Sequence, residues 1–416
     1  MIRIPLFEFQ VINKRFDNFL QRELSVINHK FTKKKTLLPI DPKTSSVSAF
    51  PISGHHRASL REYIEDPARN NFNFIRLIAS LLVLLTHCFV FYPSRRDPVS
   101  VLSNNLFTGA WLGVCSFFFL SGLLVTQSIR QGSSIKKFAV RRFLRIYPPA
   151  WLVIFLCAFV LGPLLTTWKL SFYLQNADFH HFLLNIFLVR IQYTLPGVWE
   201  HSPAGPGLTS SFWSLCLEVK LYALLAFVYA LKIPGRRVLG IWLLFAIFLF
   251  DLFFLNQTKA IFSRIGLSAG NPLDYTLIAP LFGIGVLCNV CQDQIIITKN
   301  WLGAILVLSG IFFYYSLLVP ATFILIPIVI LYIGTKGVKW IKKITPKADL
   351  SYGIYLFGVP VGKGVFIYFH PENAWIYFLM SAAAITLFAV LSWYGLERKL
   401  RALKVRLDSR RASGQD

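Results

Sequence analysis

Arg76 and His87 lie eleven positions apart within one apolar segment, residues 74–89. Eleven residues make almost three helical turns, so on a helix both side chains share one face, roughly 16 Å apart along the axis. Ionisable side chains are costly inside a bilayer and rarely face lipid, which makes this pair a candidate functional site. Such a pair suits a long ligand with an anionic head at the guanidinium and a reactive tail at the imidazole. Alone, His87 would more simply be a hydrogen-bonded packing residue.

A cluster of arginines follows the second apolar segment, at Arg141, Arg142 and Arg145. Arg141 and Arg145 are four positions apart and share a face of any short helix in this predicted inner loop. Guanidinium groups bind phosphates through paired hydrogen bonds, although the charges could also serve only to orient the protein in the membrane.

Ser121, at mid-membrane in the second segment, either allows close helix packing or offers space or a hydroxyl group to an acyl chain.

Ser214, Glu218 and Tyr222 follow one another at intervals of four and form a polar stripe on the fourth apolar segment. Glu218 is expected near the outer end of its helix, at a depth comparable with that of His87. A buried carboxylate beside an imidazole would fix its tautomer and stabilise the imidazolium formed during proton transfer. We therefore expect Glu218 to pair with His87. An ion pair with Lys220 is disfavoured, because i and i+2 positions face different sides of a helix.

The composition indicates an all-α polytopic membrane protein. Of 416 residues, 55% are hydrophobic, and the mean hydropathy is +0.57. Repeated apolar stretches of about 20 residues explain these values, and the alternation typical of membrane strands is absent. The net charge of +24 falls mainly in the N-terminal extension, the short loops and the tail. It therefore indicates membrane orientation, and we expect no nucleic-acid partner.

About ten spanning helices are expected, with both termini in the cytoplasm, because this topology places most basic loops inside. The predicted spans are 74–93, 110–130, 146–168, 213–231, 238–256, 273–291, 302–318, 320–336, 350–369 and 374–396. Residues 181–195 are apolar but short, and predict an interfacial or re-entrant helix in an outer loop.

The predicted spans divide the chain into three parts. Residues 1–70 form a cytoplasmic extension expected to be poorly ordered, residues 71–400 a transmembrane domain, and residues 401–416 a basic cytoplasmic tail. The six cysteines fall mostly in apolar runs and predict small buried residues, with no metal site. Lys363 and Asp251 lie at membrane depth, and each needs a partner that the sequence does not identify.

Taken together, these segments resemble the membrane-bound acyltransferase-three family, which O-acylates sugars and other small acceptors. The resemblance covers roughly residues 70–400 and is carried by five pieces in order. They are Arg76-x10-His87, Phe117-Phe118-Phe119-Leu120-Ser121-Gly122, Arg141-Arg142-x-x-Arg145-Ile146-x-Pro148, Phe212-Trp213-Ser214-Leu215-x-x-Glu218-x-x-x-Tyr222 and Ser351-Tyr352-x-x-Tyr355-Leu356. The family pattern often continues from Tyr-Leu to a His, where this chain has Phe357.

The resemblance implies acyl-CoA, with acetyl-CoA the expected form, as a cosubstrate from the cytoplasm, and no permanently bound cofactor. It implies an acceptor hydroxyl group, often on a cell-surface or lipid-linked glycan. By position, Arg76 and His87 look like an essential pair, the arginines of 141–145 like a donor-binding cluster, and Glu218 like an acidic partner.

Our hypothesis from the sequence is a multi-pass O-acyltransferase of the inner membrane. The arginine cluster binds the donor's phosphates, Arg76 orients the donor, and the pantetheine arm runs past Ser121. His87, oriented by Glu218, removes the proton from the acceptor hydroxyl. Direct transfer and a covalent acyl-enzyme both fit. Two alternatives are a transporter or flippase for a glycolipid or small molecule, and a noncatalytic scaffold.

Overall fold

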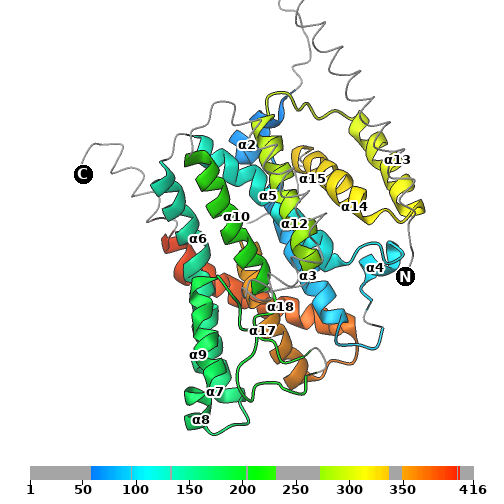
Figure 1. Cartoon of the computed structure of the whole chain (residues 1–416). Coiled ribbons are helices and arrows are strands. Elements are labelled where there is room, and N and C mark those ends of the chain that lie inside the picture. Colours follow the sequence, from blue (N-terminus) through cyan, green and yellow to red (C-terminus); the bar gives the residue numbers. More distant parts are fainter. Residues whose placement is uncertain are drawn as a thin grey trace, which may run out of the picture. The chain divides into compact units, whose positions relative to one another are not determined.

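Figure 1 shows a computed structural model of the chain, which describes residues 58–94, 96–131, 134–202, 205–230, 272–336, 349–400 and 402. For residues 272–276 it describes the helix but not the side chains. All of these residues belong to one compact unit. The predicted fifth span at 238–256, with Asp251, lies outside the described residues.

The described residues are helical, and their only β-pairing is two isolated bridges, Ser59–Ile296 and Thr166–Val198. Seven described helical runs are long and apolar enough to cross a membrane. They are α3 (Phe72–Phe89); α5 (Gly109–Arg130); α6 (Ile135–Leu156) with η2 (Cys157–Leu161) and α7 (Gly162–Leu165); α10 (Phe212–Ala230); α14 (Leu318–Pro320) with η4 (Ala321–Leu325) and α15 (Ile326–Thr335); α17 (Ser351–Phe369); and α18 (Ala374–Ser392) continuing through η5 (Trp393–Glu397) to Leu400.

Two further apolar helices, α12 (Pro272–Val290) and α13 (Asn300–Tyr314), coincide with predicted spans but have shorter apolar stretches. The class of the fold, an all-helical multi-pass membrane protein, is therefore confirmed. Ten spans and two cytoplasmic termini stay predictions.

The third span starts earlier than the sequence suggested. Helix α6 begins at Ile135 because Ser134 caps it, accepting a hydrogen bond from the Lys137 N–H at 3.2 Å. The predicted arginine loop is thus helical, and Arg141 and Arg145 lie in its second and third turns. Their head groups are consequently held by a rigid element.

Two segments at the borders of the predicted membrane region are also ordered. Helices α2 (Leu60–Glu65) and η1 (Pro67–Arg69) lie in the predicted N-terminal extension, and the N–H of the buried Leu60 donates to Ile295 O at 2.8 Å. The short helix predicted at 181–195 lies earlier in the chain. Three short helices, α8 (Leu170–Gln175), α9 (Ala177–Leu183) and η3 (Leu184–Phe187), follow one another there and end at Phe187.

The loop that follows, from 188 to 211, packs into the bundle. Leu195, Val198 and Leu208 are each at most 2% exposed. A loop this apolar and buried must satisfy its own backbone groups, and Leu208 N–H donates to Tyr193 O at 2.7 Å. Its described part therefore acts as a packed element between α9 and α10.

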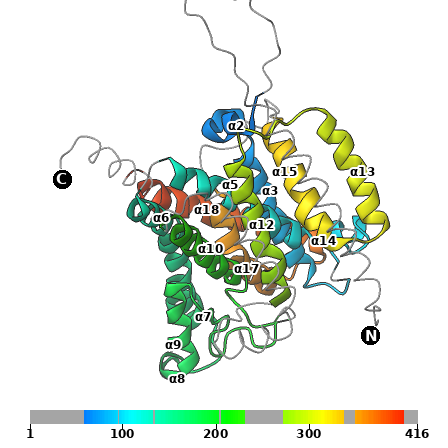
Figure 2. The same cartoon turned by 45° about the horizontal axis from the view of Figure 1, so that its top comes forward.

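Helix α5 forms the centre of the bundle, between α3 and α12 (Figure 2). Glycines allow this close approach: a Cβ atom on Gly113 would lie 2.5 Å from Ala79 O, and one on Gly122 would lie 1.9 Å from Phe282 O. The short α4 (Pro98–Leu102) precedes α5. Backbone contact on both faces of α5 fixes the depth of every polar group that the helix carries.

Candidate functional site

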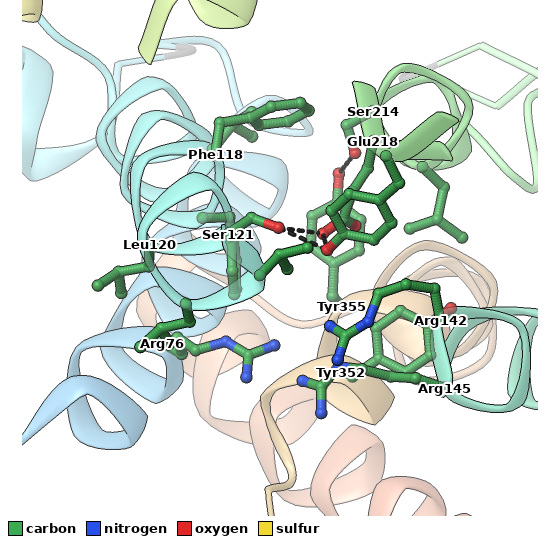
Figure 3. Close-up of a pocket in the computed structure, with 16 residues that line it drawn as sticks. Arg76, Phe118, Leu120, Ser121, Arg142, Arg145, Ser214, Glu218, Tyr352 and Tyr355 are labelled. Carbon is green, nitrogen blue, oxygen red and sulfur yellow. Dashed lines mark hydrogen bonds between the residues drawn. The ribbon is translucent and has the colours of Figure 1, made fainter. Parts of the chain in front are cut away.

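A cavity of about 210 Å³ opens between α3, α5, α6, α10 and α17. Its polar lining includes Arg76, Ser121, Arg142, Arg145 and Glu218, which brings together five of the seven site residues expected from the sequence. Figure 3 shows the guanidinium groups of Arg76, Arg142 and Arg145 converging from α3 and α6 on the same space. We call this side of the bundle the arginine end.

Asp349, just before α17, holds two of the three guanidinium groups. Arg76 Nη1 and Arg145 Nη2 each donate to its Oδ2 atom at 2.7 Å. Burial alone would raise the pKa of Asp349, but the two guanidinium groups and the Ser351 hydroxyl outweigh it, so this pKa lies well below its usual range. One carboxylate oxygen is therefore shared between two cations.

Arg142 stays outside this ion pair. Its Nε–H is buried and has no hydrogen-bond acceptor in the part of the chain that the structure describes, and its guanidinium carbon lies 5.9 Å from the centre of the Tyr222 ring. Even with Glu218 ionised, three guanidinium groups face two carboxylates, counting Asp349. The surplus of positive charge and the unused donor suit a bound anion.

Ser121 and Glu218 join α5 to α10 across the cavity (Figure 3). The hydroxyl groups of Ser121 and Tyr222 both donate to Glu218 Oε1, Ser121 at 2.7 Å, and their own oxygens are 2.5 Å apart. Next to them, Ser214 Oγ lies 2.5 Å from the Tyr355 hydroxyl. One carboxylate oxygen of Glu218 thus accepts from two hydroxyl groups at the arginine end.

The register of α3 against α5 shows how far His87 lies from this network. Gly113 faces Ala79 and Val83, so Ser121 lies two turns further toward the arginine end and His87 lies about six residues toward the other end. At 1.5 Å per residue, Ser121 and His87 are about 21 Å apart along the helix axes. The opposite side of the bundle, where His87 lies, is called the His87 end below.

The predicted pairing of Glu218 with His87 is therefore wrong. The sequence placed Glu218 at the depth of His87 by counting from the start of its helix. In the structure Glu218 bonds to Ser121, at the depth of Arg76, because α10 starts from the loop that packs into the bundle. The helix start is thus an unreliable marker of depth here.

A backbone carbonyl fixes the tautomer of His87, which the sequence analysis expected Glu218 to do. His87 Nδ1 lies 2.7 Å from Val83 O, one turn earlier on α3. A carbonyl oxygen can only accept, so Nδ1 carries the proton and Nε2 of the neutral ring is left as a proton acceptor. His87 is partly buried and does not line the arginine cavity.

Arg141 also lies apart from the cavity. It lines a separate pocket with Trp393 and Glu397, although Arg142 and Arg145 border both spaces. The reason is the helix phase, because successive positions on α6 point about 100° apart.

Sequence reasoning missed two residues of the arginine end, one that pairs with its guanidinium groups and one that lines the cavity. Asp349 was the one acid next to the start of the ninth span, in a region of basic residues, and this isolation was a usable signal. From the sequence, Tyr355 had no expected role beyond its place in the family pattern, but its hydroxyl bonds to Ser211 O at 2.9 Å and to Ser214, and its ring lines the cavity. Only tertiary contacts could reveal that role.

Comparisons with known proteins agree with the resemblance seen in the sequence. Residues 69–394 match a family model, that of the acyltransferase-three family, which is described as "Acyltransferase domain". "Nodulation protein 10" of Rhizobium leguminosarum bv. viciae is 25% identical over 382 residues, covering 83% of this chain and 96% of that protein. "Putative acetyltransferase ORF330" of Acidianus two-tailed virus is 25% identical over 180 residues, covering 43% of this chain and 46% of that protein.

No solved structure is significantly similar to the chain. The family match nevertheless covers more than half of the sequence and includes every residue of the cavity. The chain therefore belongs to the acyltransferase-three family, and it is an acyltransferase that moves groups other than aminoacyl groups.

Proposed function

We propose that this protein is an O-acyltransferase of the inner membrane. It moves an acyl group, with acetyl the expected one, from acyl-CoA to a hydroxyl group of a cell-surface or lipid-linked glycan. The observation that carries the proposal is the cavity lined by three guanidinium groups and one carboxylate, with Asp349 as the ion-pair partner of two of the guanidinium groups. Its position next to a buried hydrogen-bonding network suits a phosphate-bearing donor with a polar arm.

The donor's phosphates bind at the arginine end. Arg142 offers a buried Nε–H without an acceptor, and Arg145 keeps a third of its side chain exposed beside Asp349. Guanidinium forks match phosphate oxygens, and charge-assisted hydrogen bonds are among the strongest in proteins. Arg76 orients the donor by its ion pair with Asp349, and Ser121 lies on the route of the pantetheine arm.

The reactive end of the donor extends toward His87, which lies roughly 16 Å from Arg76 along α3. His87 Nε2 removes the proton from the acceptor hydroxyl as its oxygen attacks the thioester carbonyl carbon. The C–O bond forms, the C–S bond breaks, and the CoA thiolate takes the proton back from the imidazolium. The Val83 carbonyl, not Glu218, keeps Nδ1 protonated throughout.

Glu218 acts at the donor end instead. By accepting from Ser121 and Tyr222 it fixes two hydroxyl groups beside the arginines. Removing the carboxylate would leave both hydroxyl groups free to rotate. Glu218 is thus a positioning residue for the donor.

A pair of measurements tests the proposal. Full-length protein in proteoliposomes is given acetyl-labelled acetyl-CoA, and surface glycans of a deletion strain are compared by mass spectrometry with those of a complemented strain. We expect labelled donor to bind, and the complemented strain alone to carry ester-linked acyl groups. The matched variants are Arg142→Gln, which should lose donor binding, and Arg190→Gln, an exposed arginine outside the cavity, which should keep it.

Two results would contradict the proposal. Identical glycans in both strains would argue against glycan acylation, and binding that survives Arg142→Gln unchanged would argue against the arginine end as the donor site. Passage of a glycolipid across the membrane without covalent change would favour the transporter alternative.

A further inference from the structure

Lys363 is a buried cation held by neutral groups. On α17 its side chain is only 3% exposed, yet its ammonium donates to Gly205 O and lies 5.8 Å from the centre of the Trp199 ring. Among the described residues, no carboxylate lies within ion-pair distance of it. The partner that the sequence could not identify is therefore a backbone carbonyl and an indole face.

Neutral partners leave an ammonium group incompletely satisfied. It has three N–H donors, and one of them is used. Burying such a charge is unfavourable unless an opposite charge pairs with it, and a carbonyl oxygen or an indole ring cannot neutralise it. An anion that reached Lys363 would thus displace the carbonyl as the preferred partner.

The segment that holds Lys363 is built under strain. Trp199 has φ +54°, a left-handed conformation that is rare for a bulky residue, and Gly205 has φ +74°. Strained backbone of this kind persists only where its surroundings enforce it, and it concentrates at ligand-binding sites. The Ser202 carbonyl accepts from Gly205 N–H at 2.8 Å, and its buried hydroxyl group has no hydrogen-bond partner among the described residues.

This arrangement lies at the His87 end, away from the arginine cavity. Lys363 follows Asp349 by fourteen residues, about 21 Å along α17, and α3 and α17 run side by side in the same direction from the Arg76–Asp349 ion pair. Past His87 and Lys363, the Tyr92 hydroxyl donates to Pro371 O at 2.7 Å, so the ends of the two helices are still in contact. Lys363 is absent from the lining of the arginine cavity.

We propose that Lys363, with Trp199 and the unpaired hydroxyl of Ser202, forms a binding site for an anionic group of the acceptor. This inference rests on the proposed function and adds the acceptor's chemical class: a glycan that bears a carboxylate or a phosphate close to the hydroxyl to be acylated. The anion takes the donors of Lys363, and the hydroxyl beside it reaches His87.

The test measures binding and does not depend on turnover. Full-length protein is titrated with methyl glucuronide, methyl glucoside 6-phosphate and uncharged methyl glucoside, and ligand-induced changes in melting temperature give the dissociation constants. The variants are Lys363→Met, which removes the charge at similar volume, Lys363→Arg, which keeps it, and Arg142→Gln at the arginine end. Binding of acetyl-CoA to each variant is recorded in parallel.

We expect at least one anionic glycoside to bind the wild-type protein more tightly than methyl glucoside. That preference should fall about tenfold or more in Lys363→Met and persist in Lys363→Arg and Arg142→Gln. The glycoside that binds more tightly shows whether the acceptor's anionic group is a carboxylate or a phosphate. Acetyl-CoA binding should be unchanged in Lys363→Met, so a failed donor site and a failed acceptor site give different results.

Three outcomes would overturn the inference. They are no preference for either anion in the wild-type protein, equal loss of charged and uncharged ligands in Lys363→Met, and loss of the anion preference in Arg142→Gln. The last outcome would place the anion at the arginine end, and it decides the question even if Lys363→Met does not fold.

Discussion

Replacing Asp349 with Asn removes the charge that two guanidinium groups share. The Asp349 side chain is 7% exposed, and those of Arg76 and Arg145 are 18% and 32% exposed. Removing one partner of a buried ion pair costs about 3–5 kcal/mol, and we take about 3 kcal/mol because both arginines keep some contact with solvent. Asp349→Asn should therefore lower the melting temperature of the purified protein clearly.

The matched control is Asp293→Asn, because Asp293 pairs with Arg61 at 3.4 Å and both side chains are 52% exposed. Exposed pairs contribute about 0–1 kcal/mol, so this variant should melt close to the wild-type protein. Equal melting temperatures for the two variants, measured at one scan rate in one detergent, would refute the reasoning.

The pH dependence of the difference in melting temperature between the wild-type protein and Asp349→Asn gives a second check. The pKa of Asp349 is lowered in the folded protein, so its contribution is complete above the unfolded value of about 3.9 and is lost as the pH falls through the folded value. The gap in melting temperature between wild type and Asp349→Asn should stay constant from about pH 5 to 8 and shrink only in stronger acid. A gap that changes near neutral pH would assign the effect to another group.

Three more predictions follow from the packing and the two ends of the bundle. Arg145→Gln should raise the KM for acetyl-CoA about 10- to 100-fold in steady-state kinetics, because a charge-assisted hydrogen bond contributes about 1.5–3 kcal/mol, while Arg190→Gln leaves it unchanged. Glu218→Gln should raise the same KM without moving the pH profile of kcat, since Val83 O holds the His87 tautomer; a moved profile would restore the Glu218–His87 pairing. Gly122→Ala should reduce the yield of folded protein in size-exclusion chromatography, because its Cβ atom would meet Phe282 O at 1.9 Å, whereas Gly358→Ala, with open space around it, should not.

The features of this fold that follow from the polarity of single residues and short runs could be predicted from the sequence. Long apolar runs located nine of the ten predicted spans on described helices, because the bilayer dictates both length and polarity. Arg76 and Ser121 were identified because a polar group within such a run needs a specific partner or function, and Arg142 and Arg145 because they cluster in a predicted inner loop.

Depth was the quantity that the sequence could not supply. Counting residues from a helix start assumes that the start lies at the membrane surface, and α10 follows a loop with Val198 and Leu208 fully buried. Ser121, which bonds to Glu218, and Gly205, which bonds to Lys363, are 97 and 158 residues away from these partners, so no local pattern could reveal the two contacts. Glycine contacts between neighbouring helices fixed the register that the sequence left open.

The most direct measurement of the central claim is the acyl-transfer rate of His87→Ala at saturating donor and acceptor. General-base catalysis contributes about 10²–10⁴-fold, so we expect kcat to fall at least about 100-fold. Acetyl-CoA binding should be retained, because the donor's phosphates lie at the arginine end. An unchanged kcat, or a loss of donor binding equal to the loss of rate, would contradict the account.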